Sequence, residues 1–204
     1  MIAPHPDDEA IGCGGTIAKH CARGERVEVA FLTSGERSLR ELEPEQAWRI
    51  REREAQEAAA VLGIADLEFM RLPDWGLSDP NGAPGALAAL AALWERVSPS
   101  TVYAPHPGEW HPDHRAAAEL AANAAHRTGL GAARVLGYEV WTPLSGYAIV
   151  EDVGEVFDTK LEAIRRYVSQ IEQFDYVSAA EGIARYRGAL AARCAYAEVF
   201  AQGA

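Results

Sequence analysis

Two short motifs, His5-Pro6-Asp7-Asp8-Glu9 and His111-Pro112-Asp113-His114, bring imidazole and carboxylate groups together. His5 and Asp8 stand where a strand is expected to give way to a helix, and their spacing lets both side chains turn toward one point. His114 is expected to approach that point from a neighbouring strand end. Two imidazoles and one carboxylate leave a coordination position open for water, as catalytic zinc sites do. We therefore expect His5, Asp8 and His114 to bind zinc.

The other groups of the motifs suit the proton transfers of hydrolysis. Zinc would lower the pKa of bound water toward about 7 and provide a nucleophile at neutral pH. Asp7 can take the proton as a general base and later deliver it to a leaving amine. His111 can stabilise an oxyanion or act as general acid. Asp113 is expected to fix the tautomer of His111 and raise its basicity.

Purely structural roles are the competing interpretation of these residues. Asp8 suits the N-cap of a helix, and Glu9 suits the positive end of the helix dipole. Capping accounts poorly for so many acid and imidazole groups at two predicted strand ends, so the metal site is favoured. His106, in the same loop as His111, is either a further ligand or part of the loop structure, and we favour the structural role.

Predicted helices and strands alternate along the chain and must position these groups. This alternation implies right-handed crossovers and a mostly parallel sheet covered on both faces, a Rossmann-like three-layer αβα sandwich. Such folds bind ligands beyond the carboxyl ends of the strands, where both motifs fall. The expected helices are 9–22, 45–62, 86–97, 114–127, 159–172 and 177–191, and the expected strands are 27–32, 67–72, 101–104, 135–140 and 147–150.

The length of 204 residues allows one well-buried core, so we expect a single domain over residues 1–204. Residues 1–4 leave little room for a strand, which is therefore either very short or truncated at its amino end. Residues 12–15 (GCGG) lack the last glycine of a dinucleotide-binding fingerprint, so close helix packing is favoured. Residues 79–85 form a turn-rich loop.

Charge argues against nucleic acid as a partner. The net charge is -11, whereas phosphate recognition needs clustered Lys and Arg. Arg49, Arg51 and Arg53 alternate with Glu52 and Glu54, as on a solvated helix face. We expect a small or neutral substrate.

The cysteine pattern and hydropathy indicate a cytoplasmic protein. Cys13, Cys21 and Cys194 are odd in number and lack a CxxC spacing, so no disulfide framework is expected. No run reaches the roughly 18 apolar residues of a membrane span, and no signal peptide is recognisable. A homo-oligomer is compatible with the apolar terminal helices.

The segments PHPDDEAIGCGGT and HPDH resemble the signature motifs of the PIG-L or LmbE-like de-N-acetylase family. The resemblance continues through Arg51-x-x-Glu54 and the tripeptide 72–74. It implies a zinc hydrolase that removes an N-acetyl or related N-acyl group from an amino sugar or its conjugate. It also implies His5, Asp8 and His114 as zinc ligands, Asp7 as general base and His111 as electrostatic or acid catalyst.

The same resemblance suggests residues of the substrate pocket. Arg51 and Asp74 would bind sugar hydroxyls or a neighbouring ring. Alternatively, Arg51 pairs with Glu54 or Glu52 on its own helix, and Asp74 caps a turn.

Two further pocket residues lie in the second motif's loop. Glu109 stands where mycothiol-type relatives carry a tyrosine, which suggests a different oxyanion partner or a different acyl substrate. Trp110 and Trp75 can supply apolar walls or sugar-stacking faces, or simply pack.

Two other functions are compatible with part of the pattern. Two histidines and one carboxylate also bind iron in non-heme oxygenases, but Asp7 and His111 are required for hydrolysis and not for oxygenation. A non-catalytic metal or sugar-binding module is the other alternative, and the filled catalytic positions argue against it.

Overall fold

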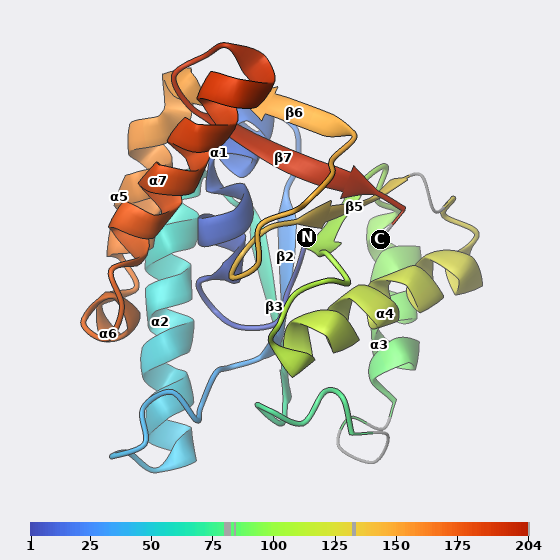
Figure 1. The fold of residues 1–204 in the computed structure, drawn as a ribbon. Helices are drawn as coiled ribbons and strands as arrows, with labels where there is room; N and C mark the ends of the chain where they lie inside the picture. Colours follow the sequence, from blue (N-terminus) through green and yellow to red (C-terminus); the bar gives the residue numbers. More distant parts are fainter. Residues whose placement is uncertain (80–82, 84, 132–133, 204) are drawn as a thin grey trace.

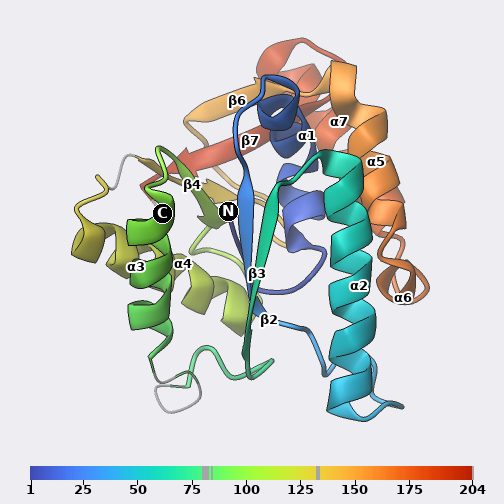
Figure 2. The same ribbon diagram turned by 180° about the vertical axis from the view of Figure 1, so that it is seen from behind.

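Helices cover both faces of a twisted sheet in a three-layer αβα sandwich (Figures 1 and 2). The computed structural model describes residues 1–79, 83, 85–131 and 134–203. Residues 80–82 and 84 of the expected loop lie outside the described part. The helices are α1 (Asp8–Ala22), α2 (Pro44–Leu62), α3 (Ala86–Val97), α4 (Pro112–Thr128), α5 (Phe157–Arg165), α6 (Val168–Ile171) and α7 (Tyr176–Arg187). The strands are β1 (Ile2–Ala3), β2 (Glu28–Thr33), β3 (Asp66–Leu72), β4 (Val102–Pro105), β5 (Val135–Tyr138), β6 (Ile149–Asp152) and β7 (Ala197–Gln202).

The sheet is mostly parallel, as expected. β1 pairs with β2, β2 with β3, and β4 with β5, all in parallel. β7 lies between β5 and β6 and is antiparallel to both. The strands form two hydrogen-bonded sheets, β1-β2-β3 and β4-β5-β7-β6. Because β1 lies beside β4, their order in space is β3-β2-β1-β4-β5-β7-β6. The chain runs outward from the centre in both directions, which is the Rossmann-like arrangement.

Strand β2 shows how the sheet divides the core. Its side chains alternate in direction, as the pleat requires. Val29 and Phe31 pack on the face covered by α1, α2, α5 and α7. Ala30 and Leu32 pack on the face covered by α3 and α4. Both faces are apolar, as expected for a parallel strand covered on both sides.

The glycines of α1 serve close packing, as favoured from the sequence. A Cβ at Gly12 would lie 2.3 Å from the ring of Tyr138, and one at Gly15 would lie 2.6 Å from Val153. Neither separation is sterically possible, so larger residues would push α1 away from its neighbours.

The carboxyl-terminal third differs most from the expected elements. The helix expected at 159–172 is split into α5 and α6 around Tyr167, whose hydroxyl binds the Glu9 carboxylate. The helix expected at 177–191 ends at Arg187 and continues as a π-helical segment, Gly188–Ala192. Strand β7 was not expected at all, and the strand expected at 147–150 lies at 149–152. No described helix is long and apolar enough to cross a membrane.

Candidate metal and catalytic site

Both motifs lie at the point where the strand order reverses. β1 leads through a short loop into α1, while the neighbouring β4 leads into α4. β2, which follows β1 in the chain, lies on one side of β1. β5, which follows β4, lies on the opposite side of β4. The two loops therefore diverge above the sheet and leave a crevice at their carboxyl ends, the usual ligand position in open α/β sheets.

His5, Asp8 and His114 come together at this crevice. Asp8 Oδ2 lies 3.2 Å from His5 Nδ1 and 3.3 Å from His114 Nε2. One potential ligand atom from each residue lies within 4.8 Å of the others, the arrangement of a metal site. The His114 side chain is completely buried, yet neither ring nitrogen makes a hydrogen bond within the described part of the chain. A buried imidazole that lies beside carboxylates but makes no hydrogen bond suits a metal ligand.

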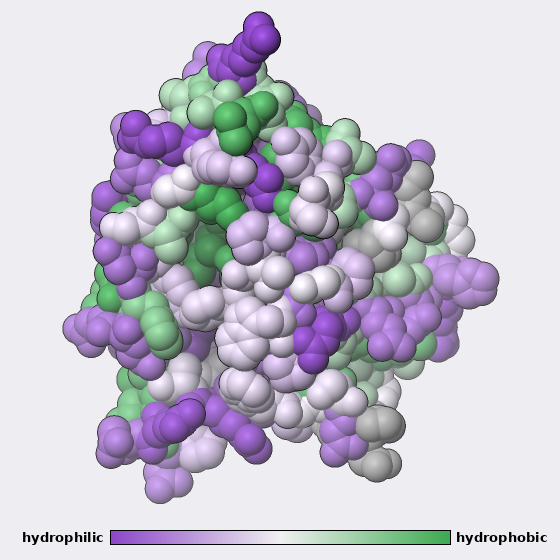
Figure 3. Space-filling view, in the orientation of Figure 1, coloured by the Kyte–Doolittle hydropathy of each residue, from purple (hydrophilic) through white to green (hydrophobic). Residues whose placement is uncertain are grey.

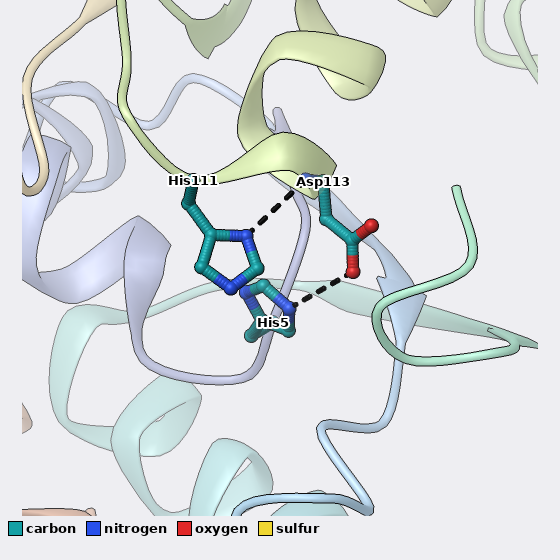
Figure 4. Close-up of side chains that lie close together, drawn as sticks. All are labelled: His5, His111 and Asp113. Carbon is teal, nitrogen blue, oxygen red and sulfur yellow. Dashed lines mark hydrogen bonds and ion pairs between the residues drawn. The ribbon is translucent and has the colours of Figure 1, made fainter. Parts of the chain in front are cut away.

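A second group, formed by His5, His111 and Asp113, also satisfies the distance criterion (Figure 4). Two of its members, Asp113 and His111, already make hydrogen bonds. The Asp113 carboxylate accepts hydrogen bonds from the backbone amides of Trp75, at 2.7 Å, and Leu77, at 3.1 Å. The Asp113 amide donates to His111 Nδ1 at 3.2 Å. The group with His114 therefore fits a metal better.

The contact between Asp113 and His111 involves the backbone, as Figure 4 shows. The sequence suggested that the Asp113 carboxylate would orient the ring. Because Nδ1 accepts the amide proton, a neutral His111 must carry its own proton on Nε2. The expected fixing of the tautomer is thus achieved by the Asp113 amide, while its carboxylate holds the loop at residues 75–77.

Asp74 contacts the other nitrogen of His5, with its Oδ1 3.1 Å from Nε2. It was expected to contact substrate, and it does line the cleft described below. Its position beside His5 also matches the carboxylates that orient metal-binding histidines.

Electrostatics at the site favour cations. Burial would raise the pKa of Asp8, but His114 and His5 together hold it well below its usual range. Burial would lower the pKa of His114, but Asp8 and Glu109 raise it to about 9. The carboxylates that favour protonation of the imidazoles would equally favour a divalent cation in place of the protons.

Asp7 is held in a strained backbone conformation at the start of α1. Its φ of 137° is sparsely populated by residues other than glycine. Its amide donates to Glu9 Oε2 at 3.1 Å, and Arg51 Nη2 lies 3.2 Å from its Oδ2. Burial raises the pKa of Asp7 to about 7, although Arg51 acts in the opposite direction. A carboxyl group of this pKa is suited to exchange protons near neutrality.

A cleft of about 810 Å³ opens above these groups. Arg51, Asp74 and Trp110, three of the residues expected to bind substrate, lie in its lining. On the face of the molecule shown in Figure 3, pale, weakly polar side chains spread between α2 and α4. Hydrophilic side chains gather over the loop that leads into α2. Aromatic residues form part of the wall: Trp75, Trp110, Trp141, Phe174 and Tyr176.

Glu109 lies below the cleft and is absent from its lining. Only 1% of the residue is exposed. Its carboxylate accepts hydrogen bonds from the amides of Val140, Trp141 and Thr142 and lies 3.5 Å from His114 Nδ1. This geometry differs from the substrate contact expected from the sequence. It places Glu109 behind His114, on the side away from Asp8.

Other contacts at the site could not be seen in the motifs. His106 Nε2 lies 2.7 Å from the Thr142 carbonyl oxygen, consistent with the structural role favoured above. Tyr167 reaches Glu9 from a distant helix break, and Ser38 accepts from Arg51 at 2.6 Å. No local pattern in the sequence marks these partners.

The family model described as GlcNAc-PI de-N-acetylase, PIG-L, matches residues 1–125. The chain belongs to the PIG-L family. The resemblance noted in the two motifs is therefore confirmed.

Several known proteins are similar to this chain over most of its length. A probable N-acetyl-alpha-D-glucosaminyl L-malate deacetylase 2 from Bacillus anthracis is 31% identical over 83% of this chain and 80% of its own length. A conserved protein from Thermus thermophilus superimposes with a TM-score of 0.85 and 31% identity, over 100% of this chain and 93% of that one. A 4-carboxy-2-hydroxymuconate hydratase from Pseudomonas putida gives a TM-score of 0.80 and 26% identity, over 98% and 93%.

Proposed function

We propose that this chain is a zinc-dependent hydrolase that removes the N-acetyl group from an N-acetylglucosamine-type sugar conjugate. Membership in the PIG-L family and the deacetylase relative support the reaction and the type of substrate. The observation that supports the metal is the buried imidazole of His114, which makes no hydrogen bond among the described residues and lies beside Asp8 and His5. These three residues would hold the ion, and zinc there would supply Lewis acidity and a water of lowered pKa.

Asp7 would act as the general base. Arg51 binds its Oδ2, which leaves Oδ1 for proton exchange with the attacking water and then with the departing amine. The fixed orientation of Asp7, set by Arg51 and by Glu9, keeps this oxygen beside the cleft. Proton transfer by a positioned carboxylate contributes typically about 100-fold or more to such reactions.

His111 would stabilise the developing oxyanion. Its Nδ1 accepts from the Asp113 amide, so its Nε2 is the donor available to substrate. A preorganised N–H directed at a growing negative charge is among the strongest contributions to acyl-group hydrolysis. Trp75 contacts the His111 ring at 4.4 Å between centroids and would restrict its motion.

The aromatic wall would bind the sugar ring or its aglycone. Trp110 and Trp141 are 55% and 37% exposed, with ring centroids 6.0 Å apart. Exposed indoles can stack on the apolar face of a sugar while their N–H groups stay hydrated. Arg51 and Asp74 in the cleft lining supply the polar groups that would orient its hydroxyls.

The test is acetate and free-amine release by the zinc-loaded protein from N-acetylglucosamine, N,N'-diacetylchitobiose and N-acetylglucosaminyl malate. Asp7→Asn should retain zinc and the fold while turnover falls about 100-fold or more. Asp66→Asn, at an exposed carboxylate at the start of β3, is the matched control and should leave turnover unchanged.

Other outcomes would select a different function. Hydration is the second candidate reaction, because a similar structure is that of a hydratase. It is tested by incubating the same protein with 4-carboxy-2-hydroxymuconate. Water addition without acetate release would refute the deacetylase, and so would iron-dependent oxygen consumption. Zinc binding without turnover of any substrate would favour a binding module.

A further inference from the structure

Aromatic rings lead outward from His111 along one side of the cleft. The Trp110 ring contacts the His111 ring at 5.5 Å between centroids, and Trp141 contacts Trp110 at 6.0 Å. Phe174 continues the series, with its ring centroid 5.7 Å from that of Trp141. All three contacts are edge-to-face, and the three outer residues all line the cleft. We call Trp110, Trp141 and Phe174 the outer aromatic group.

The outer aromatic group is exposed, although its members are large apolar side chains. Phe174 is 54% exposed, about as much as Trp110. Leu42, in the loop before α2, is exposed in the same cleft. Large apolar side chains that gather in one exposed patch mark an interaction site, whereas scattered ones need no explanation. The outer end of the cleft is therefore suited to bind an apolar group.

Backbone hydrogen bonds hold both tryptophans in place before a ligand binds. The Trp110 amide donates to Thr142 Oγ1 at 3.0 Å, and the Trp141 amide donates to Glu109 Oε1 at 3.1 Å. The loops that follow β4 and β5 are joined by these bonds. A preorganised surface of this kind loses little conformational entropy on binding.

Polar side chains of α6 and of the turn after it are hydrogen-bonded within the protein. Ser169 Oγ donates to Glu54 Oε2 at 2.7 Å. The side-chain amide of Gln170 donates to Ser38 Oγ at 3.2 Å. The side-chain amide of Gln173 donates to the carbonyl oxygen of Ser169 at 2.9 Å. These residues line the cleft, but their donors are already used. A second sugar would need such donors for its hydroxyls, so this end of the cleft suits a less polar group.

Charged side chains at the rim of the cleft balance each other. Arg37 and Arg40 lie in the lining. Glu41 and Glu172 lie there too, and all four residues are exposed. Exposed charges are screened by salt and contribute little to binding. An acidic aglycone would therefore gain little here over a neutral one.

We propose that the outer aromatic group binds an aromatic aglycone on the sugar that carries the acetyl group. The inference rests on the proposed deacetylase function and adds the substrate class, an aryl glycoside of N-acetylglucosamine. With the acetamide between Asp7 and His111, the aglycone extends over Trp110 toward Phe174. Aromatic rings in edge-to-face or offset contact bind more strongly than their buried area alone provides. The cleft, at about 810 Å³, is in the size range of pockets that enclose drug-sized ligands.

Phenyl, cyclohexyl and methyl glycosides of N-acetylglucosamine test the class of aglycone. The zinc-loaded protein should release acetate from the phenyl glycoside with a kcat/KM about 10-fold or more above that for the methyl glycoside, because KM is lower. The cyclohexyl glycoside should lie between them. Phe174→Ala should reduce the phenyl-to-methyl ratio to about 2 or less, whereas Phe174→Tyr should retain it. Val168→Ala, at an exposed apolar side chain of α6 outside the cleft lining, is the matched control and should leave the ratio unchanged.

Calorimetry with the deacetylated products separates recognition from turnover. Phenyl glucosaminide should bind the zinc-loaded protein about 10-fold or more tighter than methyl glucosaminide, and Phe174→Ala should remove the difference. Equal affinities for the two products, or a cyclohexyl product that matches the phenyl one, would overturn the aromatic aglycone while acetate release still supports the deacetylase.

Two further outcomes distinguish the substrate class from the reaction. Acetate release from none of the glycosides would refute the deacetylase, and the calorimetric comparison would then decide the aglycone class by itself. A higher kcat/KM for N-acetylglucosaminyl malate than for the phenyl glycoside would overturn the aromatic aglycone in favour of an acidic one.

Discussion

Arg51 Nη2 lies 3.2 Å from Asp7 Oδ2, and both side chains are almost completely buried. The same guanidinium also donates to the carbonyl oxygen of Pro6 and to the hydroxyl of Ser38. Arg51 therefore fixes the backbone and the carboxylate of the proposed base together. Its contact with substrate, suggested by its place in the cleft, comes in addition to this role.

Replacing Arg51 should damage stability and turnover together. Arg51→Met leaves the Asp7 carboxylate buried without its cation, which should lower the free energy of unfolding by about 3 kcal/mol. Turnover should fall about 10-fold or more as the base loses its orientation. Urea unfolding and steady-state kinetics measure the two effects. Arg51→Lys keeps the charge but not the fork geometry and should be intermediate. A raised KM with unchanged stability would show that Arg51 only binds substrate.

Glu109 should control metal affinity rather than substrate affinity. Its carboxylate lies 3.5 Å from His114 Nδ1, on the opposite side of the ring from Asp8. Glu109→Gln should weaken zinc binding about 10-fold or more, as loss of such orienting carboxylates typically does. Competition with a chromogenic chelator gives the dissociation constant. An unchanged zinc affinity together with a raised KM would instead support the substrate contact that was expected from the sequence.

Zinc should stabilise the folded protein through His114. At a free zinc concentration of 100 times the dissociation constant, binding adds about 2.7 kcal/mol to the free energy of unfolding. For a domain of this size, Tm should rise by about 5–10 °C, and a chelator should reverse the rise. His114→Ala should abolish this shift. His126→Ala, at an exposed histidine on the same helix, should retain it in full.

Trp110 should distinguish substrates by the size of their aglycone. Trp110→Ala should raise KM for N,N'-diacetylchitobiose about 10-fold, in the range of one aromatic contact. Its effect on N-acetylglucosamine itself should be smaller, and kcat should be unchanged for both sugars. Trp110→Phe keeps a ring and should largely preserve KM. Equal effects on both substrates would show that Trp110 contacts the sugar from which the acetyl group is removed.

The buried pair of Lys160 and Glu198 should determine stability without affecting the chemistry. Lys160 Nζ donates to Glu198 Oε1 at 2.6 Å, and Glu198 also accepts from the amides of Gly15 and Thr16. Lys160→Met should lower the free energy of unfolding by about 3–5 kcal/mol, because the buried Glu198 carboxylate loses its cation. The double variant Lys160→Met, Glu198→Gln should regain part of the lost stability. A loss below about 1 kcal/mol would contradict this role.

Much of the fold could be predicted because its signals are local. The alternation of apolar runs with amphipathic segments correctly indicated α1 to α4 and β2 to β5, with bounds that differ by a few residues. The carboxyl-terminal third was harder to predict because packing overrides periodicity there. A Cβ at Gly188 would lie 2.7 Å from the Cys194 carbonyl oxygen, so the close return of the chain into β7 depends on this glycine.

The identity of the groups that gather at the site follows from the amino-acid sequence alone. Histidines and carboxylates that follow two neighbouring strands can meet at one end of the sheet, and here β1 lies beside β4. The contacts of Glu109, Asp113 and Arg51 depend on the folded structure. Their partners include backbone groups far away in sequence, at 140–142, 75–77 and residue 6. A carboxylate or guanidinium binds whichever donors or acceptors the fold brings to it, and no local pattern encodes that choice.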